Sequence, residues 1–406
     1  MKPARLRRIL ALMVTGVSTL TVGCGGTSST SGGGNGGSGS TSNVQAITVN
    51  AGPAGGYVDG AFTSVMVCVP GSTASCQTVS GILVDTGSSG LRILSSALTI
   101  SPPQQTASNG DPVVECLPFL DGFTWGPVQS VDLTIAGEHA KSLPIQVIGS
   151  SNFSTIPASC SSNGAPENDL ASLGANGILG VGIFAQDCGT ACTQSGASNP
   201  GLYYTCPAAG CQITTESVAN QVQNPVSLFA KDNNGVIVEL PSVSGSETSV
   251  SGSLIFGIGT QSNNGLGSAT VYTLDPATGN ITTTYHGATY TNASFIDSGS
   301  NGIYFLDATT TGFPVCTNAT FWYCPSSTQN LSATNQGANG ATASVDFVVA
   351  NATTLTSNAA DAAVNGIAGP NSGMFDWGLP FFFGRNVYTA IEGQSTPGGA
   401  GPYWAY

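Results

Sequence analysis

The sequence has few charged residues and almost no basic ones. Only 7% of the 406 residues are charged, with 8 Lys and Arg against 21 Asp and Glu. Half of the basic residues lie within positions 1–8, so from residue 24 onward the formal charge is 4 − 21 = −17. Such a chain would repel phosphate backbones, and it has no basic cluster that could release counterions on binding. We therefore predict no nucleic-acid partner and no attraction to anionic membrane surfaces.

Patterns for metal binding and for serine hydrolysis are also missing. The two histidines are His139 and His286, and no cysteines have Cys-x-x-Cys spacing. Structural zinc sites need such thiolate pairs or nearby histidines. A Gly-x-Ser-x-Gly elbow, which would indicate a serine nucleophile, does not occur either. We expect neither a metal nor another cofactor.

Long amphipathic helical patterns are scarce, whereas short apolar runs are frequent. Runs of apolar or β-branched residues at 62–69, 131–135, 236–240 and 254–258 lie between clusters of Gly, Pro, Asn and Ser. Such runs bounded by turn residues are typical of strands. With 40% hydrophobic residues the chain can bury a large core. We predict a large all-β protein whose only helices are short, around 215–223 and 357–364.

The N-terminus has the pattern of an export signal. Basic residues up to Arg8 precede an apolar run at 9–22 and then Gly23-Cys24. The end of this run resembles the lipobox of bacterial lipoproteins, although Thr21 stands where an aliphatic residue is usual. We expect residues 1–23 to be a signal peptide, Cys24 to be acylated, and residues 24–43, rich in Gly and Ser, to be a flexible tether. The alternative is plain signal cleavage with a free Cys24.

Cysteine arithmetic supports export to an oxidising compartment. Ten of the 11 cysteines remain after Cys24, an even number compatible with five disulfides. Three pairs have the spacing of small disulfide-closed turns: Cys68 and Cys76, Cys206 and Cys211, and Cys316 and Cys324. The pairing among the other four is left open: Cys116, Cys160, Cys188 and Cys192. We expect the protein to be anchored by lipid in the bacterial cell envelope, in the outer membrane or facing the periplasm.

Two segments, residues 81–91 and 293–303, share one pattern. Each is an apolar strand that ends in Asp, then Ser or Thr, Gly and Ser. A single Asp at a strand end is usually the acceptor of a turn. A related pair could instead bring two carboxyl groups to one interface. The two segments supply these residues: Asp85, Thr86, Gly87 and Ser88, and Asp297, Ser298, Gly299 and Ser300.

Two carboxyl groups within hydrogen-bond reach cannot both ionise easily. The pair keeps one proton, and its two apparent pKa values separate. One carboxyl can then act as base and the other as acid on a water that attacks a peptide carbonyl. The glycine of each turn permits close backbone approach, and the hydroxyl groups can orient the carboxylates.

At these residues the sequence resembles the pepsin-like aspartic peptidases. In that family an apolar-apolar-Gly segment runs beneath each Asp, and residues 177–182 match the first, while residues 376–388 are the second counterpart with a Trp-Gly-Leu-Pro variation. Residues 252–257 resemble the strand that opens the second lobe. The resemblance implies a bilobal all-β acid-protease fold, with an N-terminal lobe at 44–245 and a C-terminal lobe at 246–406. It implies that Asp85 and Asp297 are catalytic, and that Thr86, Gly87, Ser88, Ser298, Gly299 and Ser300 support them.

Residues 233–241 and 257–264 also resemble an uncharacterised family of bacterial lipoproteins with this architecture. The departures from the peptidases are specific. Those enzymes have a Trp seven residues after the first Asp, bonded to a Tyr on a flap hairpin, whereas this chain has Arg92 and Phe119. The flap candidates are Phe119, Phe123 and Trp125. We expect Arg92 to point into the cleft region, to lower the pKa values of the pair, and so to shift any activity to strongly acidic pH.

The leading hypothesis is an aspartic endopeptidase that acts as a monomer on extended peptides or unfolded protein segments. It contacts the membrane only through acylated Cys24. The alternative is a weakly active or inactive envelope lipoprotein that binds peptides with the same fold. A third hypothesis is a purely structural envelope protein.

Overall fold

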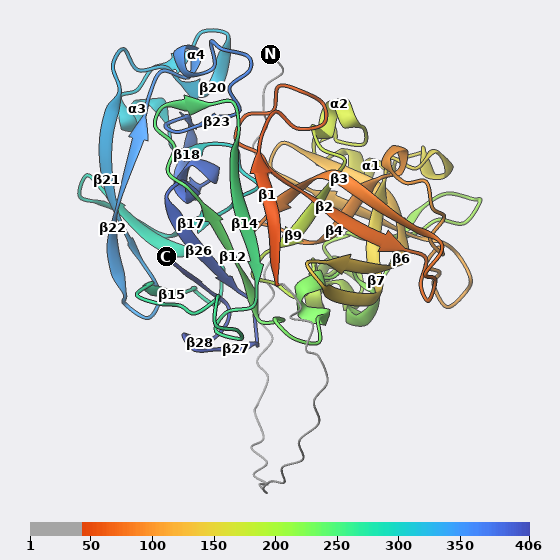
Figure 1. Cartoon of the computed structure of the whole chain (residues 1–406). Helices are drawn as coiled ribbons and strands as arrows, with labels where there is room; N and C mark the ends of the chain where they lie inside the picture. The colour runs from red at the N-terminus through yellow and green to blue at the C-terminus, as the bar shows by residue number, and fades with distance from the viewer. Residues whose placement is uncertain (1–42) are drawn as a thin grey trace, which may run out of the picture.

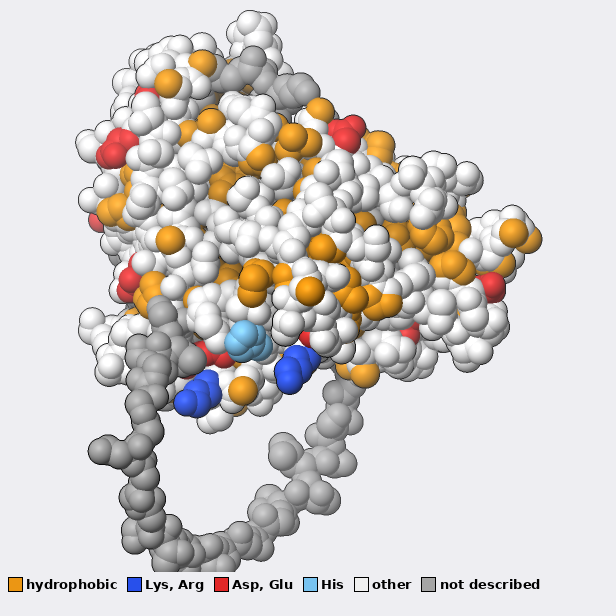
Figure 2. Space-filling model, turned by 45° about the vertical axis from the view of Figure 1, so that its right-hand side comes forward, with side chains coloured by type: hydrophobic (Ala, Val, Ile, Leu, Met, Phe, Trp, Pro, Cys, Tyr) orange, Lys and Arg blue, Asp and Glu red, His pale blue; other side chains and the backbone are white. Residues whose placement is uncertain are grey.

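The computed structural model describes residues 43–406, and β-strands are their main secondary structure. Two β lobes lie side by side, with strands β1 (Val44–Val49) and β14 (Val250–Phe256) between them (Figure 1). The predicted all-β bilobal fold is confirmed. Figure 2 shows one face of the molecule, on which uncharged and apolar side chains predominate and acidic groups are scattered.

The N-terminal lobe contains a closed barrel of six strands. Their order is β6-β7-β4-β9-β3-β2, and β2 pairs in turn with β6, which closes the ring. The inner faces supply much of one continuous apolar core, for example Val65, Ile82 and Leu133. The six strands are β2 (Ala61–Cys68), β3 (Cys76–Asp85), β4 (Ser89–Leu94), β6 (Gly122–Ile135), β7 (Glu138–Ile148) and β9 (Gly177–Val181).

A hairpin extends from this barrel where the flap is expected. Strand β5 (Val113–Pro118) pairs with the first half of β6, and residues 119–121 form the turn. Two short strands border the hairpin, β8 (Ala165–Pro166) beside β6 and β10 (Tyr203–Thr205) beside β5, and β11 (Gln212–Ile213) pairs with the outer edge of β10.

The barrel sheet continues into the C-terminal half. Strand β1 pairs with both β2 and β14, so a single sheet passes from one lobe to the other. Beyond β14 it continues through four strands in the order β12-β26-β29-β15. These are β12 (Gly235–Leu240), β26 (Arg385–Ala390), β29 (Tyr403–Ala405) and β15 (Val271–Thr273).

A second sheet of seven strands forms the rest of the C-terminal lobe, in the order β22-β21-β16-β17-β25-β18-β24. Aromatic rings fill its core, with Phe305 and Phe375 centred 5.4 Å apart and Phe375 stacked on Trp377. The strands are β16 (Ile281–Tyr285), β17 (Ala288–Ile296), β18 (Ile303–Leu306), β21 (Gln329–Gln336), β22 (Thr342–Val349), β24 (Ala368–Gly369) and β25 (Asn371–Trp377). Three two-stranded ribbons complete the fold: β13 (Ser246–Glu247) with β23 (Ala363–Val364), β19 (Val315–Cys316) with β20 (Ala319–Tyr323), and β27 (Ser395–Thr396) with β28 (Gly399–Ala400).

Helices are shorter than the sequence patterns indicated. Residues 215–223 contain only a 3₁₀ turn, Val218–Asn220, and residues 357–364 contain no helix, so both helix predictions were wrong. The α-helices within residues 43–406 are α1 (Ala158–Ser161), α2 (Leu170–Leu173), α3 (Ala308–Thr311) and α4 (Ala352–Leu355). Across these residues, no helix is long and apolar enough to cross a membrane.

Within residues 43–406, five disulfides join ten cysteines. The three predicted pairs form, and the four cysteines left open pair as Cys116–Cys160 and Cys188–Cys192. The Cys116–Cys160 bond joins the flap hairpin to α1. The predicted signal peptide, acylation site and tether lie outside the described residues.

Candidate active site

The two Asp-containing turns occupy equivalent positions in the two lobes. Asp85 is the last residue of β3, and Asp297 directly follows β17. Each strand has a parallel neighbour that runs beneath its Asp: β9 for β3 and β25 for β17. Parallel pairing of this kind brings the ends of both strands to the same edge, so each Asp is presented at the junction of the lobes.

The two turns are locked to each other by reciprocal hydrogen bonds. The backbone N–H of Ser298 donates to Thr86 Oγ1 at 2.9 Å, and the N–H of Thr86 donates to Ser298 Oγ at 3.1 Å. The Ser298 hydroxyl donates in turn to the carbonyl of Val84 at 2.9 Å. These buried bonds span more than 200 residues of sequence and fix the distance between the turns.

The glycines of the turns allow the carboxyl groups to meet. The N–H of Gly87 donates to Asp85 Oδ1 at 2.8 Å, and that of Gly299 donates to Asp297 Oδ1 at 2.7 Å. A Cβ on Gly87 would lie 2.5 Å from Cγ of Asp297, and a Cβ on Gly299 would lie 2.6 Å from Cγ of Asp85. Any larger residue in place of Gly87 or Gly299 would therefore push the opposite carboxyl away.

The serines of the turns bind the other oxygen of each carboxyl. The Ser88 hydroxyl donates to Asp85 Oδ2 at 2.6 Å, and the Ser300 hydroxyl lies 3.0 Å from Asp297 Oδ2. Ser300 also lies 2.7 Å from Oδ2 of Asp376, a third carboxyl that sequence reasoning did not single out. The glycine and serine contacts of the two carboxyls therefore match, and Asp376 is an addition on the Asp297 side.

Asp85 and Asp297 are buried, and their carboxyl groups face each other across the two turns, each against the glycine of the opposite turn. Burial raises the pKa of Asp297 well above its usual range, and the charges of Asp85 and Asp376 raise it further, while the N–H of Gly299 lowers it. Asp297 therefore keeps its proton to higher pH than an ordinary aspartic acid, as the acid of such a pair requires.

Arg92 does not point toward the pair, so the expectation that it lowers their pKa values was wrong. It is fully buried on β4, where its Nη2 lies 2.8 Å from Glu115 of β5 and 3.0 Å from Asp187. Its Nη1 donates to the carbonyl of Ser89 at 2.7 Å. Two carboxyl groups thus bind the guanidinium within the lobe, because an unpaired buried charge would be costly.

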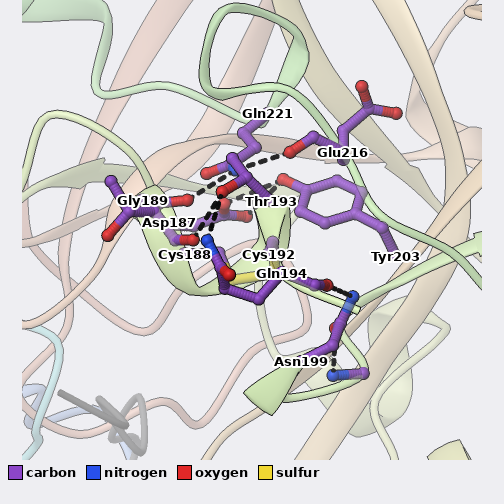
Figure 3. Close-up of a disulfide and its surroundings, with 12 residues drawn as sticks. Asp187, Cys188, Gly189, Cys192, Thr193, Gln194, Asn199, Tyr203, Glu216 and Gln221 are labelled. Atoms are coloured by element: carbon purple, nitrogen blue, oxygen red, sulfur yellow. Dashed lines mark hydrogen bonds between the residues drawn. A yellow bond between two sulfur atoms is a disulfide. The ribbon is translucent and has the colours of Figure 1, made fainter. Parts of the chain in front are cut away.

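Arg92, Glu115 and Asp187 form an ion cluster that holds the base of the flap hairpin. It stands in place of the contact between Trp and Tyr that the pepsin-like peptidases have. Tyr203 donates its hydroxyl hydrogen to Asp187 at 2.8 Å and accepts the N–H of Val222, also at 2.8 Å. Asp187 precedes the Cys188–Cys192 disulfide, and Figure 3 shows its carboxyl beside the Tyr203 ring. Burial and the neighbouring Glu115 raise the pKa of Asp187, although Arg92 opposes them.

The flap candidates are all buried. Phe119 follows the last residue of β5 and packs with Tyr57, Phe62 and other apolar residues of the N-terminal lobe. Phe123 and Trp125 pack in a different cluster around the Cys116–Cys160 disulfide. The hairpin therefore lies where it was predicted, but Phe123 and Trp125 hold it against the lobe and α1.

Three functional candidates were missed in the sequence: Glu115, Asp187 and Asp376. Asp376 had one local signal, because it stands where the resemblance expects an apolar residue in the second apolar-apolar-Gly segment. Glu115 and Asp187 had no local signal in the sequence. The one indirect signal was Arg92, because an arginine that is buried needs acidic partners.

A family model described as "Protein of unknown function (DUF3443)" matches residues 39–406. The chain belongs to this family. No curated protein matches the sequence. Among solved structures the chain is similar to an aspartic proteinase from Irpex lacteus, with a TM-score of 0.52 and 17% identity over 89% of this chain and 96% of the other. This likeness shows a pepsin-like fold for this member of the family.

Proposed function

We propose that this protein is an aspartic endopeptidase that hydrolyses peptide bonds with water activated by Asp85 and Asp297. The observation that carries the proposal is the meeting of two buried carboxyl groups in matching turns, each packed against the glycine of the opposite turn. A turn that served only structure would gain nothing from facing a second buried carboxyl, since that contact disfavours ionisation. The likeness to an aspartic proteinase supports the same reaction class.

The mechanism uses the one proton that the pair retains. The ionised carboxyl takes a proton from a water as the water oxygen bonds to the peptide carbonyl carbon, and the protonated carboxyl gives its proton to the carbonyl oxygen. As the C–N bond of the tetrahedral intermediate breaks, the carboxyl that took the proton from water gives it to the leaving nitrogen, and the other carboxyl takes back a hydroxyl proton from the intermediate, which restores the pair. The glycine N–H groups and the serine hydroxyls hold both carboxyls in place throughout. Extended peptides or unfolded segments are the proposed substrates.

The proposal is tested with purified wild-type protein and a denatured protein mixture from pH 3 to 7. Cleavage that a statine-type transition-state inhibitor abolishes is the expected result, because such compounds mimic the tetrahedral intermediate. New peptide termini are counted by mass spectrometry. Absence of cleavage at every pH, or cleavage that the inhibitor leaves unchanged, would reject the assignment.

A second candidate function is peptide binding without efficient turnover. It is favoured by the flap hairpin, which the Cys116–Cys160 disulfide and the Arg92–Glu115 ion pair attach to the lobe. In pepsin-like enzymes closure of a mobile flap accompanies catalysis, and a tethered flap would slow exchange of substrate. Tight peptide binding without new termini in the assay above would favour this function.

We also propose that the domain is exported and held at the bacterial cell envelope by acylation of Cys24. Replacing Cys24 by Ser is expected to move the protein from the membrane fraction to the soluble periplasmic fraction, because the acyl chains would be lost. Fractionation and immunoblotting of both forms measure this. Membrane association that survives the substitution would show that another interaction holds the protein.

A further inference from the structure

Asp376 is a third buried carboxyl next to the pair, and the mechanism above does not use it. It lies on β25, where it is paired with Phe295 of β17 on one side and with Tyr304 of β18 on the other. It is fully buried. Its charge acts on Asp297 and on the Tyr304 phenol.

The two lobes differ at this position. In the N-terminal lobe the residue paired with Leu83, two residues before Asp85, is Ile178. In the C-terminal lobe the residue paired with Phe295, two residues before Asp297, is Asp376. Ile178 shows that the architecture accepts an aliphatic side chain here, and burying a carboxyl instead is costly unless it is hydrogen-bonded. Packing alone therefore does not account for Asp376.

Proton counting at Ser300 shows what the extra carboxyl changes. The hydroxyl has one hydrogen but lies within hydrogen-bond distance of two carboxyls, 2.7 Å from Asp376 and 3.0 Å from Asp297. If it donates to Asp376, then Asp297 must be protonated for the second contact to be a hydrogen bond. Ser88 lies 2.6 Å from Asp85, and within residues 43–406 no second carboxyl binds it.

We propose that Asp376 is a positioning residue that draws the Ser300 hydroxyl hydrogen to itself and so keeps the shared proton of the pair on Asp297, with Asp85 as the ionised partner. This inference rests on the proposed function, because it assigns Asp85 as the base and Asp297 as the acid. A donated hydrogen bond favours the ionised form of a carboxyl, and a nearby negative charge disfavours it. Asp85 has the full Ser88 bond, whereas Asp297 shares its serine with a competing carboxylate.

The raised pKa of Asp297 has the direction that this arrangement requires. Two further acids, Asp121 and Asp59, act on Tyr304, the residue paired with Asp376. Each of these acids that is ionised disfavours a further negative charge nearby. The contribution of Asp376 is therefore obtained as a difference between variants. The groups around it are Asp297 and Asp85 at the pair, Tyr304 on β18, and beyond Tyr304 the side chains of Asp121, Asp59 and Tyr57.

Two variants test the proposal, Asp376→Asn and Asp376→Ile, the second of which reproduces the N-terminal lobe. In both, Ser300 can donate to Asp297 and a negative charge is lost, so Asp297 should ionise more easily. The basic limb of the kcat/KM profile is expected to move about one pH unit lower, because that limb reports the essential acid of the free enzyme. Asp346→Asn, which removes an exposed carboxylate from β22 of the same lobe, should leave the profile unchanged.

A second measurement does not depend on turnover. Infrared titration of the protonated carboxyl band follows Asp297 directly, and Asp297→Asn identifies its signal. The midpoint of that signal is expected to fall in both Asp376 variants and to stay unchanged in Asp346→Asn. A lowered midpoint in a protein that cleaves nothing would reject the proposed function and keep this inference. An unmoved midpoint in both Asp376 variants would overturn the inference, whether or not the protein is active.

Discussion

Replacing either Asp85 or Asp297 by Asn is expected to lower kcat for peptide cleavage by about 10⁴-fold. An amide can neither take the proton from the attacking water nor supply one to the carbonyl oxygen. The double variant should lose no more than the single variants, because the two carboxyls act as one unit and removing either abolishes the shared proton. Initial rates with a defined peptide, measured at the wild-type optimum, give the three values.

The fold must persist for this comparison to be meaningful. Each Asn side chain can still accept the glycine N–H with its amide oxygen and can donate its NH2 group to the serine oxygen, so circular dichroism and urea unfolding should match wild type closely. Asp346→Asn is the matched control, since it makes the same chemical change at an exposed site. If a folded single variant keeps activity within tenfold of wild type, the dyad is not the catalytic unit.

The strands and both Asp turns could be predicted because their signals are local. Each turn is encoded within about a dozen residues, and its duplication in the sequence indicated that the two carboxyls meet. The helix predicted at 215–223 failed because tertiary contacts override weak helical propensity there. The Gln221 side chain, for example, donates to the carbonyls of Gly189 and Glu216.

The surroundings of the turns could not be predicted, because they depend on pairing between distant segments. Ser300 meets Asp376 across 76 residues, and Arg92 meets Asp187 across 95. The sequence showed that Arg92 replaces a Trp, but not which way the guanidinium points. That direction is decided by Glu115 and Asp187, which pair with it inside the lobe and away from the catalytic candidates.

Arg92 therefore stabilises the folded protein, and replacing it should be strongly destabilising. Arg92→Met is expected to lower the free energy of unfolding by about 3–5 kcal/mol at neutral pH, because Glu115 and Asp187 stay buried without a counter-charge. Replacing Arg92 by Trp, together with Phe119 by Tyr, would leave the same two carboxyls unpaired. We expect that double variant to be unstable rather than more active.

The pH dependence of the lost stability distinguishes the effect of unpaired buried charges from a simple loss of packing. The pKa of Asp187 is already raised in the folded state, and removing Arg92 takes away the cation that opposes the rise. A carboxyl with a raised folded-state pKa contributes stability at low pH, and that contribution is lost as the pH rises through the folded-state pKa. The difference between Arg92→Met and wild type should therefore shrink in acid, as urea unfolding at pH 4, 6 and 8 would measure.

A triple variant supplies the decisive control. Adding Glu115→Gln and Asp187→Asn to Arg92→Met removes both uncompensated charges, and it should recover most of the lost stability at pH 8. If Arg92→Met is too unstable to fold at that pH, Arg92→Lys gives a measurable intermediate case, because Lys keeps the charge but lacks the second nitrogen that binds the Ser89 carbonyl. A loss equal at all three pH values, or a triple variant as unstable as Arg92→Met, would mean that the buried charges do not cause the effect.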